Sequence, residues 1–481
     1  MNDSRSLTDA SSDRNPQTAS ERGEDLVSPI MSDVGTKRWG SSETENHRTS
    51  LAQVEHASHD LSQAERLDTV IQRTGLTLEK AWRSENYNDY RFPELATSAL
   101  QKMQEEGAFL FDSIATWLIG LRKNVSEGPN EGGTFGQPPV TLYSDTSARF
   151  VIEALVWLDG TTAIHDHAFS GAFLVAQGSS VHTEYEFEMK EEIGTDMRLG
   201  SLAWKTSEIL TPGMARPIHA GEGFIHALFH LDYPSITLVA RTTTSVTRQY
   251  NYMYPGISSR AFLEPTRIKT QIRMLKALLL ANPQHFQSLA ESLLSDADLW
   301  TVRDFFATFY EKRDSVPDWD RIVAAAAEGQ DETHISAIIQ SAGEARKIAE
   351  VVALRRKVRK KDLRFFLALL MNVPDRSDIV RMTAERYPDS DPSEKIVSWI
   401  SELSDKYDIG LTFTPVTLAL ASAALDDMDL QSALDTLNKQ FPTAQLMTHR
   451  GALSDAWDEL HSITLFRSLF GSPVKGVASR R

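Results

Sequence analysis

Apolar residues change their spacing along the chain, and each change predicts a different kind of structure. Residues 1–60 contain few large apolar side chains and many Ser, Thr, Asp, Glu, Arg and Asn residues. Such a segment cannot bury enough surface to offset the entropy lost on ordering, so it is predicted to be a disordered tail. Across residues 61–128 apolar residues recur at spacings of three and four, which predicts a helical segment.

The spacing then changes to two, and it stays so across residues 138–255. The apolar segments in this range are short and are separated by turn residues: "ARFVIEALVWL", "GAFLVAQG", "VHTEYEFEM", "GFIHALFHL" and "SITLVART". Many short strands with turns between them predict an all-β barrel or sandwich.

Residues 260–475 return to a helical pattern. The apolar positions of one predicted helix lie on one side of it: Ile268, Ile272, Leu275 and Leu279. The predicted fold class is therefore α+β and multidomain. It has a central all-β barrel flanked by a short N-terminal helical segment and a large all-α C-terminal domain. Three roles stay open for that domain: a lid, an oligomerisation surface or a platform for a protein partner.

Composition narrows the classes of function. The formal net charge is −16, which argues against a protein that binds nucleic-acid phosphates. The absence of cysteine excludes disulfides, thiolate ligands and a cysteine nucleophile, and it fits a reducing compartment. No apolar run reaches the roughly 20 residues of a membrane span, and the first residues lack the apolar core of a secretory signal. We therefore expect a cytoplasmic protein that binds neither nucleic acid nor membrane.

The polar residues that carry most chemical information lie in "GTTAIHDHAFSGAFLVAQG", residues 160–178. On a strand, His165 and His167 project to the same side and Asp166 projects to the other. If that side is the interior of a barrel, two neutral imidazoles can share one metal ion. A third ligand must then come from another strand.

Four histidines further along the chain are candidates for the third ligand: His182, His219, His226 and His230. His226 follows Gly221 and Gly223, which permit a tight turn just before a strand. His219 is predicted to lie in a loop, and His230 to lie beside the metal or at the surface. His226 and His230 could also be ligands one helical turn apart, although the strand-like "SITLVA" that follows favours a strand.

His182 shares one face of its predicted strand with three glutamates: Glu184, Glu186 and Glu188. Alternation of this kind is typical of a strand with one side in water. His182 is therefore predicted to lie on a solvated face, away from the metal.

The residues and their order resemble the two motifs of the cupin superfamily. The first motif is matched by Gly160, His165, His167 and Gly178, and the second by Gly221, Gly223, His226 and His230. Gly171 stands where most cupins have a glutamate, and His230 stands where they have an asparagine. The resemblance implies a jelly-roll barrel with His165, His167 and His226 as metal ligands.

Within that superfamily, the segment "VWLDGTTAIHDHAFSGAFLVAQG" is most similar to thiol dioxygenases of the cysteine dioxygenase type. Shared features are a strand ending in tryptophan, the Ile-His-Asp-His run, and a Phe-Leu strand ending in Gln-Gly. The resemblance implies Fe(II), with Zn²⁺ or Mn²⁺ as alternatives, and a small-molecule substrate that reacts with O₂. Three neutral histidines leave Fe(II) its full charge and open positions for substrate and O₂.

The substrate-binding residues of that family are not matched. The arginine that binds the substrate carboxylate would stand at Thr141, and Arg149 is the nearest arginine. The Ser-x-His-x-Tyr strand is replaced by "PSITLVAR", which offers Thr237 and Arg241. Cysteine is therefore not expected to be the substrate, and Thr237 and Arg241 are candidates for orienting substrate or O₂.

Two other classes of function remain open. One is a metal-dependent cupin isomerase or hydrolase in which Zn²⁺ or Mn²⁺ polarises a carbonyl or a water molecule. The other is a non-catalytic cupin that senses a ligand or acts as a scaffold.

Overall fold

The structure, a computed structural model, describes residues 46–121, 139–157, 163–244, 247–261, 266–409, 412–441 and 450–471. The chain divides into two units, Met1–His56 and Ala57–Arg481, and the second unit contains the barrel and its helices. Of the predicted tail, residues 1–45 lie outside the described residues. Helix α1 (Asn46–Ser84) begins before residue 61, where the helical segment was expected to start.

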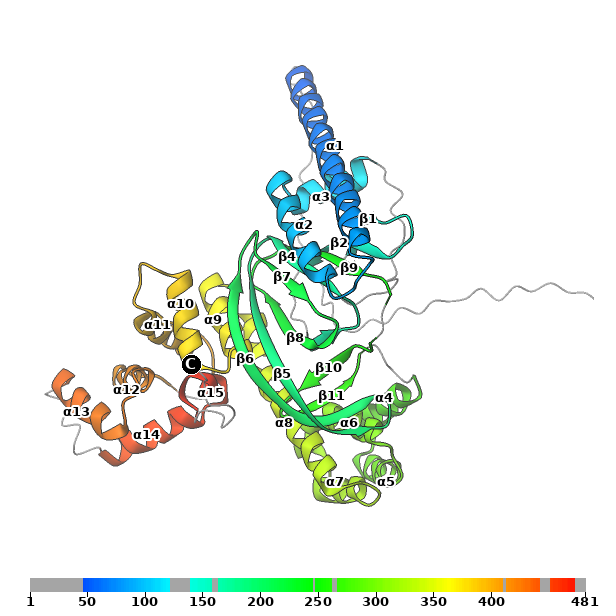
Figure 1. Cartoon of the computed structure of the whole chain (residues 1–481). Coiled ribbons are helices and arrows are strands. Elements are labelled where there is room, and N and C mark those ends of the chain that lie inside the picture. The colour runs from blue at the N-terminus through cyan, green and yellow to red at the C-terminus, as the bar shows by residue number, and fades with distance from the viewer. Residues whose placement is uncertain are drawn as a thin grey trace, which may run out of the picture. The chain divides into compact units, whose positions relative to one another are not determined.

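The predicted β-barrel is confirmed. Its strands are β1 (Pro139–Ser144), β2 (Phe150–Trp157), β3 (Ile164–His167), β4 (Gly171–Gln177), β5 (Ser180–Ile193), β6 (Met197–Leu210), β7 (Ala215–Ile218), β8 (Gly221–His230), β9 (Ser235–Thr242), β10 (Tyr250–Met253) and β11 (Ile257–Arg260). One sheet has the order β1-β2-β9-β4-β7, and the strands β10-β11-β6-β5-β8-β3 close into a barrel (Figure 1).

Apolar side chains from both sets of strands meet inside and form the barrel core, whose members are Phe173, Val175, Leu210, Ile218, Phe224, Leu228 and Val239. The first sheet is also covered on its outer side, by α1, α2 (Phe92–Glu106) and α3 (Phe111–Gly120). A strand that is buried on both sides has apolar residues at both its odd and its even positions. This explains why Phe150 and Ile152 face the helices while Leu155 faces the interior of the barrel.

The C-terminal region is helical, as predicted. Its elements are α4 (Thr266–Ala281), α5 (Pro283–Leu294), α6 (Leu299–Phe309), η1 (Tyr310–Ser315), α7 (Trp319–Ala327), α8 (Glu332–Lys357), α9 (Lys361–Asn372), α10 (Arg376–Arg386), α11 (Pro392–Lys406), α12 (Pro415–Leu425), α13 (Leu430–Gln440), α14 (Arg450–Ser462), η3 (Thr464–Phe466) and α15 (Arg467–Phe470). The predicted apolar side of α4 is buried.

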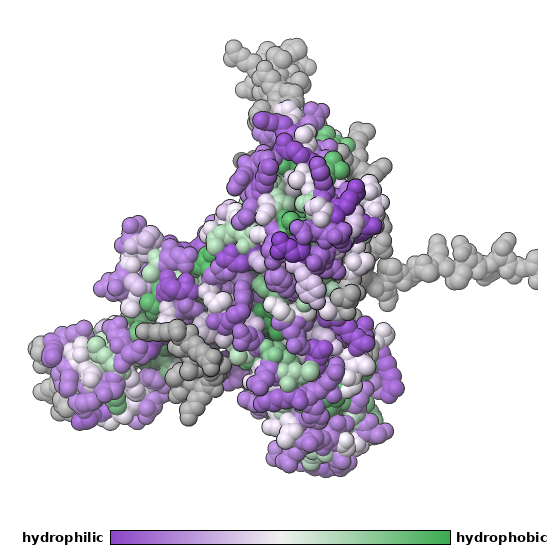
Figure 2. Space-filling view, viewed as in Figure 1, coloured by the Kyte–Doolittle hydropathy of each residue, from purple (hydrophilic) through white to green (hydrophobic). Residues whose placement is uncertain are grey.

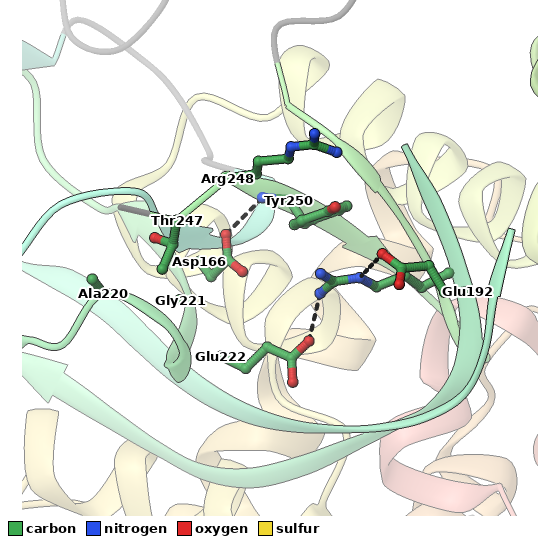
Figure 3. Close-up of a pocket in the computed structure, with 9 residues that line it drawn as sticks. Asp166, Glu192, Ala220, Gly221, Glu222, Thr247, Arg248 and Tyr250 are labelled. Atoms are coloured by element: carbon green, nitrogen blue, oxygen red, sulfur yellow. Dashed lines mark hydrogen bonds and ion pairs between the residues drawn. The ribbon is translucent and has the colours of Figure 1, made fainter. Parts of the chain in front are cut away.

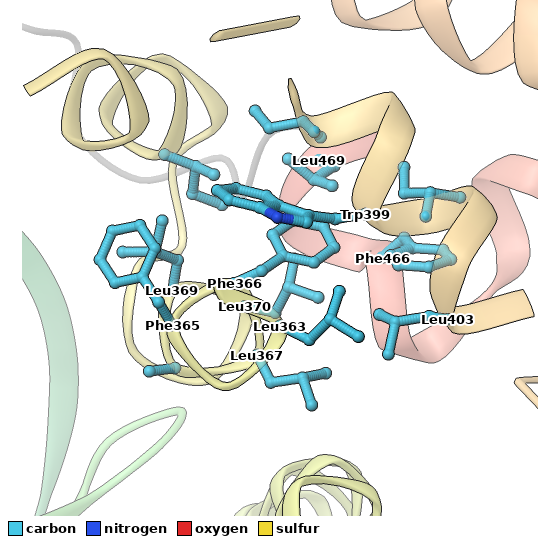
Figure 4. Packing of buried hydrophobic residues seen from close by; sticks show 14 of the residues in the cluster. Leu363, Phe365, Phe366, Leu367, Leu369, Leu370, Trp399, Leu403, Phe466 and Leu469 are labelled. Atoms are coloured by element: carbon cyan, nitrogen blue, oxygen red, sulfur yellow. The ribbon is translucent and has the colours of Figure 1, made fainter. Parts of the chain in front are cut away.

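Trp399 lies at the centre of the largest helical core, where its ring stacks on Phe366 at 5.2 Å (Figure 4). The same core includes Val181 and Phe229 from the outer side of β5 and β8, so these strands are covered by helices as well. Hydrophilic residues predominate on the face shown in Figure 2, as expected when helices turn their apolar sides inward. No helix in the described part of the chain has the length and apolar character needed to span a bilayer.

Candidate metal centre

Three histidines from two neighbouring strands come together inside the barrel. Strand β3 pairs with β8 so that His165 lies opposite His226, and the register then shifts before His167. The shift is a β-bulge or a similar irregularity in the pairing. The metal-binding nitrogens of His165, His167 and His226 all lie within 4.8 Å of one another. The Nε2 atoms of His167 and His226 are 2.9 Å apart.

These three side chains are almost inaccessible to water, with exposed fractions of 3%, 9% and 2% in chain order. Burial lowers the pKa of His165 to about 4. Burial, together with the other histidines, also brings the pKa of His167 and His226 well below its usual value. All three imidazoles are therefore neutral at neutral pH, which is the form that binds a metal ion. A group of three neutral histidine nitrogens fits a divalent transition metal.

The orientation of His165 is set by the backbone just before its strand. Its Nδ1 lies 2.7 Å from the carbonyl oxygen of Ala163. Because a carbonyl oxygen only accepts hydrogen bonds, Nδ1 carries the proton, and Nε2 is the nitrogen able to bind a metal.

The prediction that His182 lies on a solvated face is wrong. His182 is completely buried, and its Nε2 is 3.1 Å from Nδ1 of His226. Exposure increases along the same face of β5: Glu184 is half-buried, and Glu186 and Glu188 are exposed. The strand begins inside the barrel and continues beyond it, so one face is first interior and then solvated.

His230 lies away from the three histidines. It is on strand β8 together with His226, so the alternative of two ligands on one helix is wrong. The His230 ring stacks on Trp157 at 4.2 Å, and its Nδ1 is 3.0 Å from Oγ of Ser180. Nε1 of Trp157 donates to the hydroxyl of Thr237 at 3.1 Å. Thr237 therefore belongs to the part of the barrel that contains Trp157 and His230.

Arg241 lies on the same strand as Thr237 and contributes to the low pKa of His167. It is buried, and its Nε and Nη2 donate to the two carboxylate oxygens of Glu153 at 2.7 and 3.1 Å. Its charge is thus compensated inside the barrel wall. Arg149, the other arginine considered from the sequence, stacks on Tyr87 at 3.9 Å. Arg149 thus packs against the turn between α1 and α2.

The structure gives a reason for glycine at position 171. A Cβ atom on Gly171 would overlap the carbonyl oxygen of Ala240 on the adjacent strand β9. Only glycine permits such a close approach of two backbones. A glutamate cannot be accommodated here unless the two strands move apart.

Asp166 points away from the histidines, as predicted. Its carboxylate accepts from the backbone N–H of Tyr250 at 2.6 Å and from the hydroxyl of Tyr252 at 2.8 Å, and burial raises its pKa to about 6. These bonds tie β3 to β10. A pocket of about 480 Å³ lies on this side (Figure 3). Arg198 in its lining already pairs with Glu222 at 2.6 Å.

No protein-family model matches this sequence, and no curated protein sequence matches it. Several solved structures match part of the chain. Hydroquinone 1,2-dioxygenase from Sphingomonas sp. TTNP3 is 13% identical over 24% of this chain and 71% of its own, with a TM-score of 0.18. A cupin-superfamily sugar phosphate isomerase from Silicibacter pomeroyi is 16% identical over 24% and 71%, with a TM-score of 0.16. A DMSP lyase is 12% identical over 40% and 97%, with a TM-score of 0.22. These partial matches do not assign an activity.

Proposed function

We propose that this protein is a mononuclear non-haem iron enzyme that uses O₂ to oxidise a small thiol or a related metal-chelating substrate. His165, His167 and His226 would hold the metal. The observation that carries the proposal is the convergence of these three buried, neutral imidazoles in a group that contains no carboxylate. Bound there, Fe(II) would supply a site of full double charge at which an anionic thiolate and O₂ can meet.

The surroundings of the histidines support a substrate without a carboxylate group. Arg241, the arginine whose charge reaches His167, is already paired with Glu153 through two hydrogen bonds. A carboxylate that entered the barrel would find no uncompensated guanidinium at this position, and burying an unpaired charge is costly. The apolar side chains of Phe173 and Phe224 lie next to the His226 ring, at 5.5 and 4.5 Å. A small thiol without a carboxylate fits this environment better than cysteine.

Two side chains remain candidates for orienting the substrate. Arg241 lies near the three histidines, since its guanidinium is 5.5 Å from the Phe169 ring and that ring is 4.7 Å from the His167 ring. Because it is paired with Glu153, it would act on a bound group through its charge and not as a free hydrogen-bond donor. Thr237 is the other candidate, and its hydroxyl already accepts a hydrogen bond from Trp157.

Oxygen consumption by the full-length protein tests the proposal. The protein is loaded with Fe(II) under anaerobic conditions and then mixed with O₂ and a panel of aminothiols, cysteine and small acids without a thiol. We expect iron-dependent oxygen uptake that is faster with a thiol lacking a carboxylate than with cysteine. The variant His226→Ala should lose it. The variant His230→Ala, which removes a histidine buried in the same barrel but outside the group of three, should keep it.

Two results would contradict the proposal. Tight binding of Zn²⁺ or Mn²⁺ without oxygen uptake would favour an isomerase or hydrolase that polarises a carbonyl or water. Failure to bind any divalent metal would leave a ligand-sensing scaffold as the remaining class.

A further inference from the structure

A chain of hydrogen bonds leads from His226 to the wall of the barrel. His182 Nε2 lies 3.1 Å from His226 Nδ1, and His182 Nδ1 lies 2.9 Å from Glu208 Oε1. Strand pairing creates the second contact, because His182 lies directly opposite Glu208 on β6. The Glu208 carboxylate also accepts from Nε of Arg216 at 2.8 Å and from its Nη2. Side chains of four strands thus form one connected path.

The protons on the His182 and His226 rings can be assigned by starting from Glu208, at the far end of this hydrogen-bonded path. Burial by itself raises the pKa of Glu208, but hydrogen bonds from His182 and Arg216 bring it down to about 2, so the carboxylate is ionised. An ionised carboxylate only accepts hydrogen bonds, so Nδ1 of His182 donates to Glu208. When this is the one proton on the His182 ring, its Nε2 accepts and Nδ1 of His226 donates. This leaves Nε2 of His226 unprotonated, next to His167.

The same region also contains three groups with the composition of a second cation site: His182, Glu184 and Glu208. Their existing partners argue against that use. Glu208 is bound by Arg216 and His182, and Glu184 pairs with Lys205 at 3.7 Å. A cation would have to displace the arginine, whereas the hydrogen-bonded path needs no change.

We propose that His182 is a positioning residue for the metal ligand His226. It fixes the tautomer and the ring orientation of His226, so that Nε2 is the nitrogen that binds the metal. It also links that ligand to the Glu208 carboxylate. A site without a carboxylate ligand thus receives negative charge through two imidazoles. The inference rests on the proposed function, in that it takes His226 as a metal ligand. Partners of this kind typically change metal affinity by roughly 10–100-fold.

Cobalt binding to the full-length protein tests the role of His182. Co(II) affinity is measured by competition with a coloured chelator, and the visible spectrum of the bound Co(II) reports the ligand geometry. His182→Phe fills the space but removes the acceptor, so we expect about 10–100-fold weaker binding and an altered spectrum. His182→Gln keeps an oxygen that can accept from His226, and it should recover most of the affinity. His230→Gln, a change at a buried histidine outside the path, should bind as the wild type does.

A second measurement needs neither metal nor a variant. Nitrogen chemical shifts of ¹⁵N-histidine-labelled wild-type protein show which ring nitrogen carries the proton. We expect His226 to be protonated at Nδ1 in the metal-free protein. If Nε2 carries the proton instead, the inference is overturned even where His182→Phe fails to fold.

The two proposals fail in different ways. If the wild type binds no Co(II), the proposed function is contradicted. The tautomer of His226, read from the nitrogen chemical shifts, then still decides whether His182 positions the His226 ring. If the wild type binds Co(II) and His182→Phe binds it equally tightly with the same spectrum, the role of His182 is refuted while the metal centre stands.

Discussion

Of the arginine–glutamate pairs in the barrel, Arg241–Glu153 and Arg216–Glu208 differ in what lies next to the glutamate. The side chains of Arg241 and Glu153 are 9% and 3% exposed, and the two residues satisfy each other. The side chains of Arg216 and Glu208 are 27% and 26% exposed. Glu208 also accepts a hydrogen bond from His182.

We expect the buried pair, Arg241 and Glu153, to contribute mainly to stability, and the partly exposed pair, Arg216 and Glu208, to act mainly on the proposed metal centre. In the buried pair, removal of one partner leaves an uncompensated charge in an apolar interior, which is costly. The pair of Arg216 and Glu208 keeps partial contact with water, so its loss should cost less folding free energy than the loss of the buried pair. The Glu208 carboxylate instead acts on His226 through His182. The same two residue types therefore serve different purposes because of burial and of one additional neighbour.

The largest expected effect is on folding. Glu153→Gln should lower the free energy of unfolding by about 3–5 kcal/mol, because the buried guanidinium of Arg241 loses its counter-charge. Glu208→Gln should lower it by less than Glu153→Gln does, because the side chains of Glu208 and Arg216 keep partial contact with water. Urea unfolding followed by fluorescence and circular dichroism measures both. The double variant Glu153→Leu/Arg241→Met should recover most of the loss. Equal, small effects at the two glutamates would show that burial does not distinguish the pairs.

The second largest expected effect is on metal binding. Here the change at Glu208 should have the larger effect and the change at Glu153 the smaller one. Glu208→Gln should weaken Co(II) binding by about 10-fold, the lower end for a residue that acts through a ligand's partner. It removes the charge that orients His182 and keeps the shape of the side chain. Glu153→Gln should change the affinity much less in molecules that remain folded. A stronger effect at Glu153 would contradict the path through His182.

The acid dependence of stability extends the comparison to a histidine that is buried but not connected to Glu208. Burial lowers the pKa of His230 to about 3. Below its usual pKa of about 6.5 the unfolded chain takes up a proton that the folded protein does not. Stability should therefore fall as the pH drops from about 6.5 towards 3, by up to about 1.4 kcal/mol per pH unit for this residue.

His230→Gln should make that decline shallower while Co(II) affinity at neutral pH stays the same. Urea midpoints measured on both sides of pH 6.5 give the slope. An unchanged slope would mean that His230 is protonated in the folded protein.

The smallest expected effect comes from Arg216→Lys, which keeps the charge and loses the planar double contact with Glu208. The free energy of unfolding should change by less than about 1 kcal/mol, and high salt should remove most of the difference. The same exchange at Arg241 should have a larger effect that salt does not remove. Urea midpoints at low and high salt compare the two.

The barrel and the pair His165 and His167 could be predicted because alternation along a strand is a local property. Residues two apart share a side of a regular strand, and the nitrogens of His165 and His167 lie close together although the pairing with β8 shifts between these residues. The third member, His226, was implied by resemblance to a family, and the structure brings it together with the first two. That the three bind a metal stays a prediction.

His182 could not be placed correctly from the sequence. Alternation along the strand places His182 on the same side as Glu186 and Glu188. It does not show which side faces the interior or where the strand leaves the barrel. Glu208 and Arg216 gave no signal either, because they reach His182 through pairing and packing of strands distant along the chain. Such contacts depend on the register of the whole barrel.

Gly171 limits how this centre could change during evolution or design. A metal site with two histidines and one carboxylate is a common alternative to three histidines. A single codon change at position 171 cannot produce it here, since any side chain would collide with the backbone at Ala240. A carboxylate at position 171 would require β4 and β9 to move apart first, so the spacing of these two strands excludes this position as the source of a carboxylate ligand for the proposed centre.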